Sequence, residues 1–583
     1  MKKIVSTKIY RFIFSALLIA LFVPGSLLAQ NAVNHKFEIY FTPSAHQNPI
    51  TGRIILVLSK SDKQEPRFQA GSYFLSAPFW GKDVHQLKPD DRAVIDTTVP
   101  GYPVDNLRDL PAGDYYVQAV MNVYTQFHRS DGHVIWAHMD HWEGQQFASS
   151  PGNLISKVEK IHYDPSRDQS FTVKLDSVLP PIKMPANTEQ VKHIKIQSQI
   201  LTKFWGHPMY LGATILLPKG YGTHTDAHYP VVYIQGHFNL RPPFGFTKKQ
   251  SKEPPEEVAL LKDYNLENGY QFYKDYDSAH FPRMILVTFQ HPTPYYDDSY
   301  AVNSANNGPY GDAIMKELIP YIETHYRIIR KPYARVLTGG STGGWESLAL
   351  QIYHPDFFNG TWTLYPDPLD FRRFQMINLY QDNNAFYTKK LDWGYGRNQF
   401  NRNSNWLPTL RYMSRDNEGQ PIRTVKDMSR MEAVLGSHER SGQQFDIFDA
   451  VFGPVGKDGY PEPLWNKLTG EINHDAVDYA RDHGFDLRYY TAKHWHELGP
   501  KLEGKIHVYV GDGDNYYLNL AVYKFHDFLE HTKDPHYAGT FKFGRPMKGH
   551  GWEPVDQAEL LRMMAKRITD TAPKGADTKM WNY

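Results

Sequence analysis

The sequence predicts a doubly wound α/β domain with a mostly parallel sheet, preceded by a domain made of β-strands alone. After residue 187, short and almost wholly apolar runs alternate with segments of helical periodicity, which is typical of parallel strands buried on both faces. Before residue 180, strand-like runs are separated by turn residues, and no strong helical period appears. A glycine-rich turn around Ser341 joins one apolar run to a helix-like segment, so a serine is expected at a strand-to-helix junction.

The N-terminal domain is expected over residues 30–180 as a β-sandwich. Apolar runs at 52–58 and 114–120 and an alternating run at 171–175 are separated by clusters of Gly, Pro, Asn and Asp. Consecutive prolines resist both helix and sheet interior, so a stiff linker is predicted at 181–186.

One polar cluster in this domain contains residue types that can bind a divalent metal, namely His138, Asp140, His141 and Glu143. Its spacing matches no closed metal site, and polar loops often collect such residues. We interpret the cluster as a solvated loop and predict no metal ligands in the chain.

The second domain is expected over residues 187–583. Extended segments are expected first, and then strands and helices alternate. The extended segments lie at 193–202 and 210–217, the strands at 229–235, 284–289, 361–365, 506–510 and 539–543 with another from Val336, and the helices at 309–326, 345–353, 518–530 and 554–568. Residues 370–500 interrupt this order with helical patches and many aromatic residues. Because the strand C-termini face the site in such sheets, we predict a helical cap there rather than a lateral decoration.

Composition excludes several classes of protein and of site. With 583 residues, the chain is long enough for two domains. A formal net charge of +1 offers no electrostatic basis for binding nucleic acid or an anionic membrane. The sequence has no cysteine, which excludes disulfides, thiolate metal sites and a cysteine nucleophile.

Residues 1–29 are predicted to be a secretory signal peptide. Basic residues precede an apolar run at 12–23, and Ala29 supplies a small residue at the expected cleavage point. The run is short for a transmembrane helix, and Pro24 ends it. We therefore expect export to the periplasm or the extracellular space, with no membrane span after cleavage.

The turn Gly339-Gly340-Ser341-Thr342-Gly343 has the Gly-x-Ser-x-Gly pattern of a nucleophile elbow, in which a strained backbone exposes the serine hydroxyl. Its alternative is a glycine-rich loop that merely ends a buried strand. A serine needs a base and an orienting acid, and this fold supplies them in the chain order Ser, Asp or Glu, His. The expected base is His550, which glycines flank after the last expected strand.

The acid is expected from the loop after the 506–510 strand. We choose Asp514 over Asp512 because it lies further into that loop, where its side chain can reach a histidine. Asp367 and Asp370, which follow the preceding strand, are reserve candidates.

The oxyanion hole needs two backbone N–H donors. One is expected from Thr342, the residue after the nucleophile, and the other from His237 or Phe238 in the loop after the 229–235 strand. The His237 side chain has a competing role in lining the pocket.

Four segments resemble the putative-esterase family of α/β-hydrolases, which includes esterase D, enterochelin esterases and feruloyl or acetylxylan esterases. They lie at 232–237, 317–323, 339–344 and 549–551, and the resemblance covers about residues 193–569. It implies carboxylic-ester hydrolysis by a serine triad without a cofactor, with Ser341, Asp514 and His550 at the triad positions. The sequence departs from the family pattern at Gly236-His237, where His-Gly is common, and in its long insertion.

The sequence therefore predicts an exported serine hydrolase that cleaves a bulky, carbohydrate-linked or siderophore-like ester. Two alternatives remain, a serine peptidase of the same fold and an inactive binding protein. No nucleic acid partner is expected.

Overall fold

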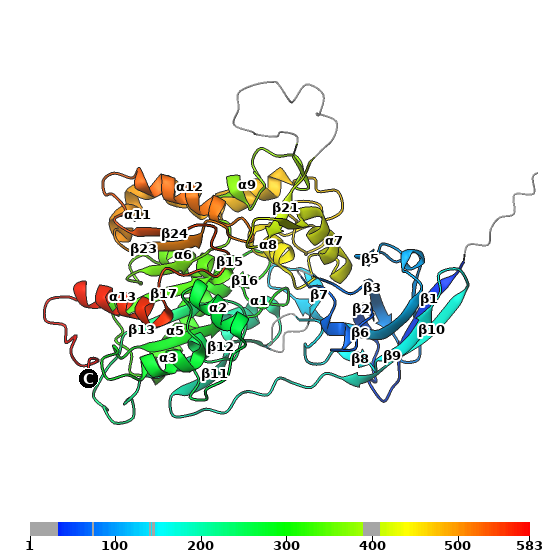
Figure 1. The fold of residues 1–583 in the computed structure, drawn as a ribbon, viewed down its shortest axis with the longest axis horizontal. Coiled ribbons are helices and arrows are strands. Elements are labelled where there is room, and N and C mark those ends of the chain that lie inside the picture. The colour runs from blue at the N-terminus through cyan, green and yellow to red at the C-terminus, as the bar shows by residue number, and fades with distance from the viewer. Residues whose placement is uncertain (1–32, 73–74, 139–141, 143–145, 389–408) are drawn as a thin grey trace, which may run out of the picture.

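A computed structural model describes residues 33–72, 75–138, 142, 146–388 and 409–583. The predicted signal peptide lies outside the described residues. In Figure 1 the second domain forms a sheet flanked by helices, and the N-terminal strands lie beside it. None of the helices in the described ranges is long and apolar enough to cross a membrane.

The N-terminal domain is all-β, as predicted. Over its described residues the strands are β1 (His35–Phe41), β2 (Ile50–Ser59), β3 (Phe79–Leu87), β4 (Ala93–Asp96), β5 (Gly101–Tyr102), β6 (Gly113–His128), β7 (Val134–His138), β8 (Leu154–Ser156), β9 (Glu159–Tyr163) and β10 (Gln169–Val178). They form one hydrogen-bonded sheet in the order β4-β1-β10-β8-β6-β2-β3-β5, with β7 and β9 paired to β6. Lys82 of β3 donates to the Val94 carbonyl of β4 at 2.8 Å. Strands from opposite ends of the strand order therefore lie side by side, so the sheet curls on itself. The facing layers of the sandwich are thus continuous.

Strand β2 shows why this domain is held firmly against the rest of the chain. Successive side chains of a strand point to opposite faces, yet every residue of β2 is buried. Ile54 and Leu56 lie in the domain's own core. Ile55 and Val57 lie in a core that continues into the second domain. The two domains therefore share buried apolar surface as well as a linker.

His138 corrects the interpretation of the polar cluster in the N-terminal domain. It ends strand β7, is 3% exposed, and its Nδ1 lies 2.5 Å from Asn122 Oδ1. His138 is therefore a buried strand residue and not part of a solvated loop. Residues 139–141 and 143–145 lie outside the described residues.

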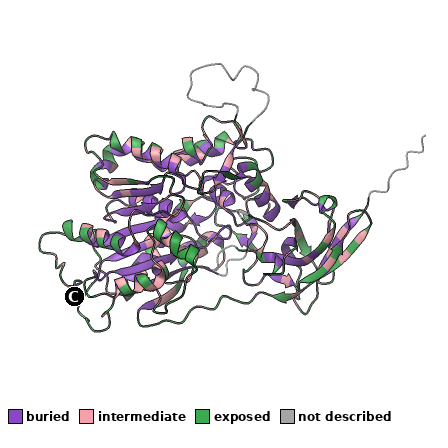
Figure 2. Cartoon of the chain, in the orientation of Figure 1, coloured by how far each residue is buried: buried purple, intermediate pink, exposed green. Residues whose placement is uncertain are grey.

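The sheet of the second domain has eight strands in the order β11-β12-β14-β13-β17-β18-β23-β24. Their bounds are β11 (Val191–Ser198), β12 (Met209–Leu216), β13 (Val231–Gln235), β14 (Ile285–Gln290), β17 (Arg335–Gly340), β18 (Thr361–Leu364), β23 (Ile506–Gly511) and β24 (Thr540–Gly544). Strand β12 is antiparallel to both of its neighbours, and from β14 onward all pairs are parallel. The predicted doubly wound, mostly parallel sheet is confirmed, and its strands are largely buried (Figure 2).

The extended segment expected at 193–202 is partly wrong, because the chain turns into helix α1 (Gln199–Trp205). Ser198 caps this helix by accepting from the Leu201 N–H at 3.1 Å. The Glu317 carboxylate also accepts from the first two N–H groups of the helix, at 3.0 and 3.1 Å. A residue more than a hundred positions away thus stabilises a short helix that local periodicity does not announce.

The other helices of this domain follow the expected alternation with strands. They are α2 (Pro255–Asp263), α3 (Gly269–Tyr276), α4 (Tyr310–Ala313), α5 (Ile319–His325), α6 (Thr342–Tyr353), α12 (Asn519–Glu530) and α13 (Gln557–Asp570). The helix predicted at 309–326 contains a π-helical turn, Ile314–Leu318, between α4 and α5. Pro320 begins the next turn and has no N–H to donate, so the regular i to i−4 pattern cannot pass through it.

The insertion lies between β18 and β23. It contains β19 (Tyr387–Thr388), β20 (Thr409–Leu410), β21 (Tyr412–Arg415), β22 (Pro421–Thr424), α7 (Val425–Leu435), α8 (Gln444–Phe452), α9 (His474–Asp482), α10 (Leu487–Lys493) and α11 (Trp495–Leu502). Arg415 donates to the Asp514 carbonyl at 3.0 Å, which places β21 at the C-terminal end of β23. This is the position predicted for a cap.

The same insertion also holds the N-terminal domain. Arg53 of β2 donates to the Val434 carbonyl of α7 at 2.8 Å, and Arg440 donates to the Trp136 carbonyl of β7 at 2.6 Å. Figure 1 shows α7 and α8 between the second-domain sheet and the N-terminal strands. The insertion thus contacts both the C-terminal edge of the second-domain sheet and the β-domain.

Candidate active site

Ser341 stands at a sharp turn between strand β17 and helix α6. Its backbone has φ 59° and ψ −122°, a conformation that an L-residue with a side chain rarely adopts. The Ser341 N–H donates to the Leu364 carbonyl at 3.1 Å, and its carbonyl accepts from the Asp367 N–H at 3.2 Å. Such a strained apex, held from both sides by the neighbouring strand end, matches the predicted nucleophile elbow.

The elbow requires glycine at position 343. A Cβ there would lie 2.2 Å from the Gln235 carbonyl oxygen of β13, and no flexible side chain could move aside. We expect Gly343→Ala to destabilise the protein by about 1–3 kcal/mol and to misplace Ser341. Thermal unfolding and ester hydrolysis would measure both effects. Gly222→Ala is the matched control, since a Cβ at that position meets nothing within 4 Å, and it should leave both unchanged.

Asp514 and His550 are brought together by the loops after β23 and β24. The His550 Nδ1 lies 2.8 Å from Asp514 Oδ2. Asp514 is fully buried, and its other oxygen accepts from the Tyr516 and Leu518 N–H groups at 2.9 and 3.2 Å. The His550 backbone N–H donates to the Asn515 side chain at 2.7 Å. The carboxylate is thus fixed in position, and it can orient the imidazole.

Asp512 points elsewhere. Its carboxylate pairs with Arg545 at 2.6 Å and accepts from the Tyr523 hydroxyl at 2.5 Å. Of the reserve candidates, Asp370 caps a short 3₁₀ turn and pairs with Arg372. Among the described residues, neither Asp512 nor Asp370 makes a hydrogen bond to His550.

Two tyrosines that the sequence reasoning missed flank His550. The rings of Tyr365 and Tyr516 lie 4.7 and 5.0 Å from the imidazole, both edge-on. The Tyr365 ring also borders the elbow, because a Cβ on Gly340 would come within 2.6 Å of it. Gly340, the residue before Ser341, and His550 therefore border the same aromatic ring. The signal was available, since Tyr365 ends an expected strand and Tyr516 follows the chosen acid by two positions.

Thr342 begins helix α6, where helical N–H groups have no partner within the helix. Its hydroxyl donates to Asp367 Oδ2 at 2.9 Å. The same oxygen accepts from the Tyr300 hydroxyl at 2.6 Å and from Gln444 of helix α8 at 3.3 Å. Burial raises the pKa of Asp367, and the hydroxyls that donate to it act in the opposite direction. Asp367 therefore links the elbow, through Thr342, to helix α8 of the cap, through Gln444.

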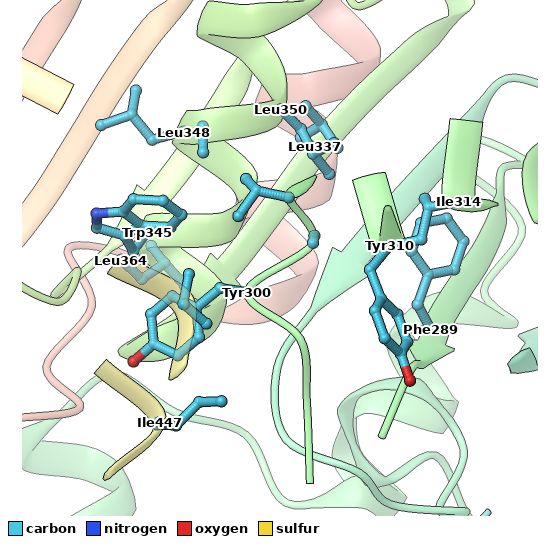
Figure 3. Close-up of a cluster of buried hydrophobic side chains, with 14 of the residues drawn as sticks. Phe289, Tyr300, Tyr310, Ile314, Leu337, Trp345, Leu348, Leu350, Leu364 and Ile447 are labelled. Atoms are coloured by element: carbon cyan, nitrogen blue, oxygen red, sulfur yellow. The ribbon is translucent and has the colours of Figure 1, made fainter. Parts of the chain in front are cut away.

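Aromatic packing continues this link between the elbow and the cap. The Tyr300 ring lies 5.4 Å from Trp345 of helix α6 and 5.9 Å from Phe448 of helix α8. Figure 3 shows Tyr300 beside Leu364 and above Ile447 in this buried cluster. Sequence patterns alone give no sign of this contact.

His237 and Phe238 follow strand β13, as predicted. The His237 Nδ1 lies 2.9 Å from Asp298 Oδ2 and 3.0 Å from Asp297 Oδ1. Burial would lower the pKa of His237, but the charges of Asp297 and Asp298 outweigh it and raise that pKa well above its ordinary value. The Phe238 ring packs edge-on against Trp142 of the N-terminal domain at 5.3 Å. The β-domain thus reaches the loop expected to supply the second oxyanion donor.

A cavity of about 560 Å³ lies in the insertion, away from these residues. It is lined by Asp370, Arg372, Tyr380, His474, Asp478, Arg481, Asp486, Arg488 and Tyr489. The reserve candidate Asp370 lines it, but Ser341, Asp514 and His550 do not, so the catalytic argument rests on the elbow and the Asp514–His550 pair.

Glu553 follows His550 by three residues and is 5% exposed. Burial raises its pKa to about 8 from an ordinary value of 4.5. The folded protein therefore retains a proton that the unfolded chain has released, so this stability is full below pH 4.5 and is lost as the pH rises through 8.

We expect Glu553→Gln to raise the melting temperature more at pH 9 than at pH 5, because each pKa unit corresponds to about 1.4 kcal/mol. Thermal unfolding at the two pH values measures this. Glu559→Gln on the neighbouring helix is the control, since the Glu559 side chain is 48% exposed. An equal shift at both pH values would contradict the prediction.

Comparison with known proteins finds one family model that matches part of the chain. Residues 209–425 match the model of the family described as Putative esterase. No curated protein sequence matches the chain.

Several solved structures are similar to this chain. A ferulic acid esterase is 16% identical over 65% of this chain and 98% of its own, with a TM-score of 0.31. The fluorophosphonate-binding serine hydrolase F of Staphylococcus aureus is 13% identical over 65% and 99%, with a TM-score of 0.29. An S-formylglutathione hydrolase from Agrobacterium tumefaciens is 11% identical over 66% and 98%, with a TM-score of 0.30.

The family match and the sheet described above agree with the resemblance found in the sequence. The match also supports hydrolytic esterase chemistry. The predicted resemblance to the putative-esterase family of α/β-hydrolases is confirmed, and the family model covers residues 209–425 of this chain.

Proposed function

We propose that this protein is an exported serine esterase in which Ser341 is the nucleophile, His550 the general base and Asp514 the orienting acid. The observation that carries the proposal is the 2.8 Å contact between buried Asp514 and His550, beside a serine held in a strained turn. A strained serine alone could be structural. The Asp514–His550 pair borders the Tyr365 ring, which also borders the elbow, so the pair can supply that serine with a base.

In the proposed acylation step, His550 Nε2 takes the Ser341 proton as the hydroxyl oxygen attacks the ester carbonyl carbon. Asp514 accepts from the His550 Nδ1–H, which fixes the tautomer that leaves Nε2 free and stabilises the imidazolium that forms. The tetrahedral intermediate then collapses. His550 gives the proton to the leaving alcohol, and the acyl group remains on Ser341. Water, activated by His550, releases the acid in the second half-reaction.

The developing oxyanion is proposed to accept from the Thr342 N–H and from the N–H of His237 or Phe238. Thr342 lies at the positive end of helix α6, which favours negative charge at this point. Its side chain is anchored on Asp367, so the peptide that carries its N–H is held before substrate binds. Donors fixed in advance need no reorganisation during the reaction.

The proposed substrate is a bulky ester, either carbohydrate-linked or siderophore-like. The support is the cap at the sheet edge and the aromatic residues around the site, Tyr365, Tyr516 and Phe238. Aromatic faces suit an aromatic acyl group or a sugar ring. No cofactor takes part in the proposed reaction.

Activity on a matched panel of substrates tests the proposal. Purified protein would be assayed with p-nitrophenyl acetate, feruloyl and siderophore-type esters, and a dipeptide p-nitroanilide. We expect ester turnover well above amide turnover. Preferred cleavage of the amide would favour a serine peptidase of the same fold, and absence of any turnover would favour an inactive binding protein.

Export is proposed from the basic and apolar N-terminal segment. The full chain would be expressed in a bacterial host with two membranes, and the protein recovered from each fraction would be analysed by intact mass. We expect a mature form that begins after Ala29 in the periplasm or medium. Unprocessed protein confined to the cytoplasm would contradict export.

A further inference from the structure

Three carboxylates and two imidazoles gather around the loops that follow β13 and β14. This acid–imidazole cluster consists of His237, His291, Asp297, Asp298 and Glu346. One nitrogen of His237 and one oxygen from each of Asp297 and Asp298 all lie within 4.8 Å of one another. None of the five side chains takes part in the proposed hydrolysis, in which the loop after β13 uses only its backbone N–H.

Two buried members of the cluster have polar atoms with no hydrogen-bond partner among the described residues. Glu346 is 0% exposed, and neither of its carboxylate oxygens is paired among the described residues. His291 Nε2 is also buried and unpaired, and it lies 3.9 Å from Glu346 Oε1. Buried polar groups of this kind normally bind a proton, a water or an ion.

The distances fit a metal ion as well as they fit hydrogen bonds. Two ligand atoms bound at about 2.1 Å lie about 3.0 Å apart at right angles, as in an octahedral site, and about 3.4 Å apart at the tetrahedral angle that Zn²⁺ prefers. The His237 Nδ1 lies 2.9 Å from the Asp298 oxygen and 3.0 Å from the Asp297 oxygen.

Access and orientation also suit an ion. Asp298 is held in place because its other oxygen accepts from the Tyr300 N–H at 3.1 Å. The His237 side chain is 44% exposed and that of Asp297 is 15% exposed, so an ion can reach the cluster from solvent.

We propose that His237 Nδ1, Asp297 and Asp298 bind one divalent transition-metal ion, Zn²⁺ or Mn²⁺. A donor set of one imidazole and carboxylates suits these ions, whereas Ca²⁺ and Mg²⁺ favour oxygen ligands alone. The ion would join the loop after β13 to the loop after β14. Its role would be structural, since no step of the proposed hydrolysis passes through it.

A second acidic group in the described residues provides the comparison. Glu439, Asp446 and Asp449 also lie close enough together to share an ion. There, however, the Lys467 ammonium lies 2.5 Å from Asp449 and 3.3 Å from Asp446. The Lys467 ammonium already occupies the position of a cation beside these two carboxylates, so we expect that group to bind no metal.

Calorimetric titration of the full chain tests the proposal. After treatment with a chelator, the wild-type protein would be titrated with ZnCl₂, MnCl₂ and CaCl₂ in separate runs. We expect one Zn²⁺ or Mn²⁺ per chain and much weaker Ca²⁺ binding. Asp297→Asn should weaken the binding of Zn²⁺ and Mn²⁺ by about 100-fold or more. Glu439→Gln should leave both the stoichiometry and the affinity unchanged.

Two further measurements keep the result decisive. Melting temperatures of the metal-free proteins show whether Asp297→Asn remains folded. If it does not, pulsed electron paramagnetic resonance of Mn²⁺ on the wild type decides, because an imidazole ligand couples its nitrogen to the metal. Absence of saturable binding, loss of binding in Glu439→Gln alone, or a Mn²⁺ signal without nitrogen coupling would overturn the proposal. The titration contains no ester, so its outcome is independent of the proposed esterase activity.

Discussion

Replacing Ser341 by alanine is expected to reduce ester hydrolysis by about 10³- to 10⁶-fold while the protein stays folded. Only the attacking oxygen is lost, because alanine keeps the Cβ and hence the same backbone strain at φ 59°. Initial rates with p-nitrophenyl acetate measure the loss. Far-ultraviolet circular dichroism and the melting temperature show whether the fold survives.

Ser347→Ala is the matched control for this variant. Ser347 lies on helix α6, which begins directly after Ser341, and its hydroxyl donates to the Gly344 carbonyl at 3.0 Å. Its removal should cost about 1 kcal/mol of stability and leave turnover nearly intact. Near-native turnover by Ser341→Ala would reject Ser341 as the nucleophile.

Asparagine at position 514 is expected to lower turnover by about 10⁴-fold, whereas asparagine at position 512 should change it little. An amide at 514 can present N–H to His550 and so favour the wrong tautomer. In the part of the chain that the structure describes, the Asp512 carboxylate pairs with Arg545 and Tyr523, and asparagine would lose at most part of those contacts. Steady-state rates of the two variants, measured side by side, give the contrast.

The pair of aspartate variants is matched, because the two residues lie two positions apart in one loop and undergo the same chemical change. A melting temperature for each variant separates instability from lost catalysis. If Asp512→Asn proves to be the inactive variant, the 2.8 Å contact of Asp514 with His550 is not the catalytic one. If both variants stay active, the acid lies outside this loop.

Much of the second domain could be predicted because its signals are local. Strands β13 and β14 are buried on both faces, so each is a nearly unbroken apolar run. Helix α6 follows a glycine-rich turn, and its apolar residues Trp345, Leu348 and Ile352 recur at helical spacing. The candidate catalytic residues follow from the same logic, because a serine, an acid and a histidine each stand just after a predicted strand.

Other features depend on contacts between distant residues, and no local pattern reports them. Helix α1 is capped by the distant residue Glu317. The sequence around the helix does not show this contact, so its first residues were predicted to continue a strand. His138 was interpreted as solvated, although it is buried beside Asn122 of the neighbouring strand. Asp367 was considered a reserve acid, and yet it accepts from Tyr300 and Thr342.

The sequence by itself determined which segments become strands and helices and which reactive side chains stand at their ends. Periodicity, glycine positions and chain order are local properties, and they suffice for those conclusions. Only the tertiary structure decided which side chains face one another: Tyr300 and Thr342 toward Asp367, His237 toward two aspartates about sixty positions away, and the insertion toward the β-domain. The physical reason is that a hydrogen bond or ion pair depends on a few ångströms of separation, and folding alone sets that separation for residues far apart in the chain.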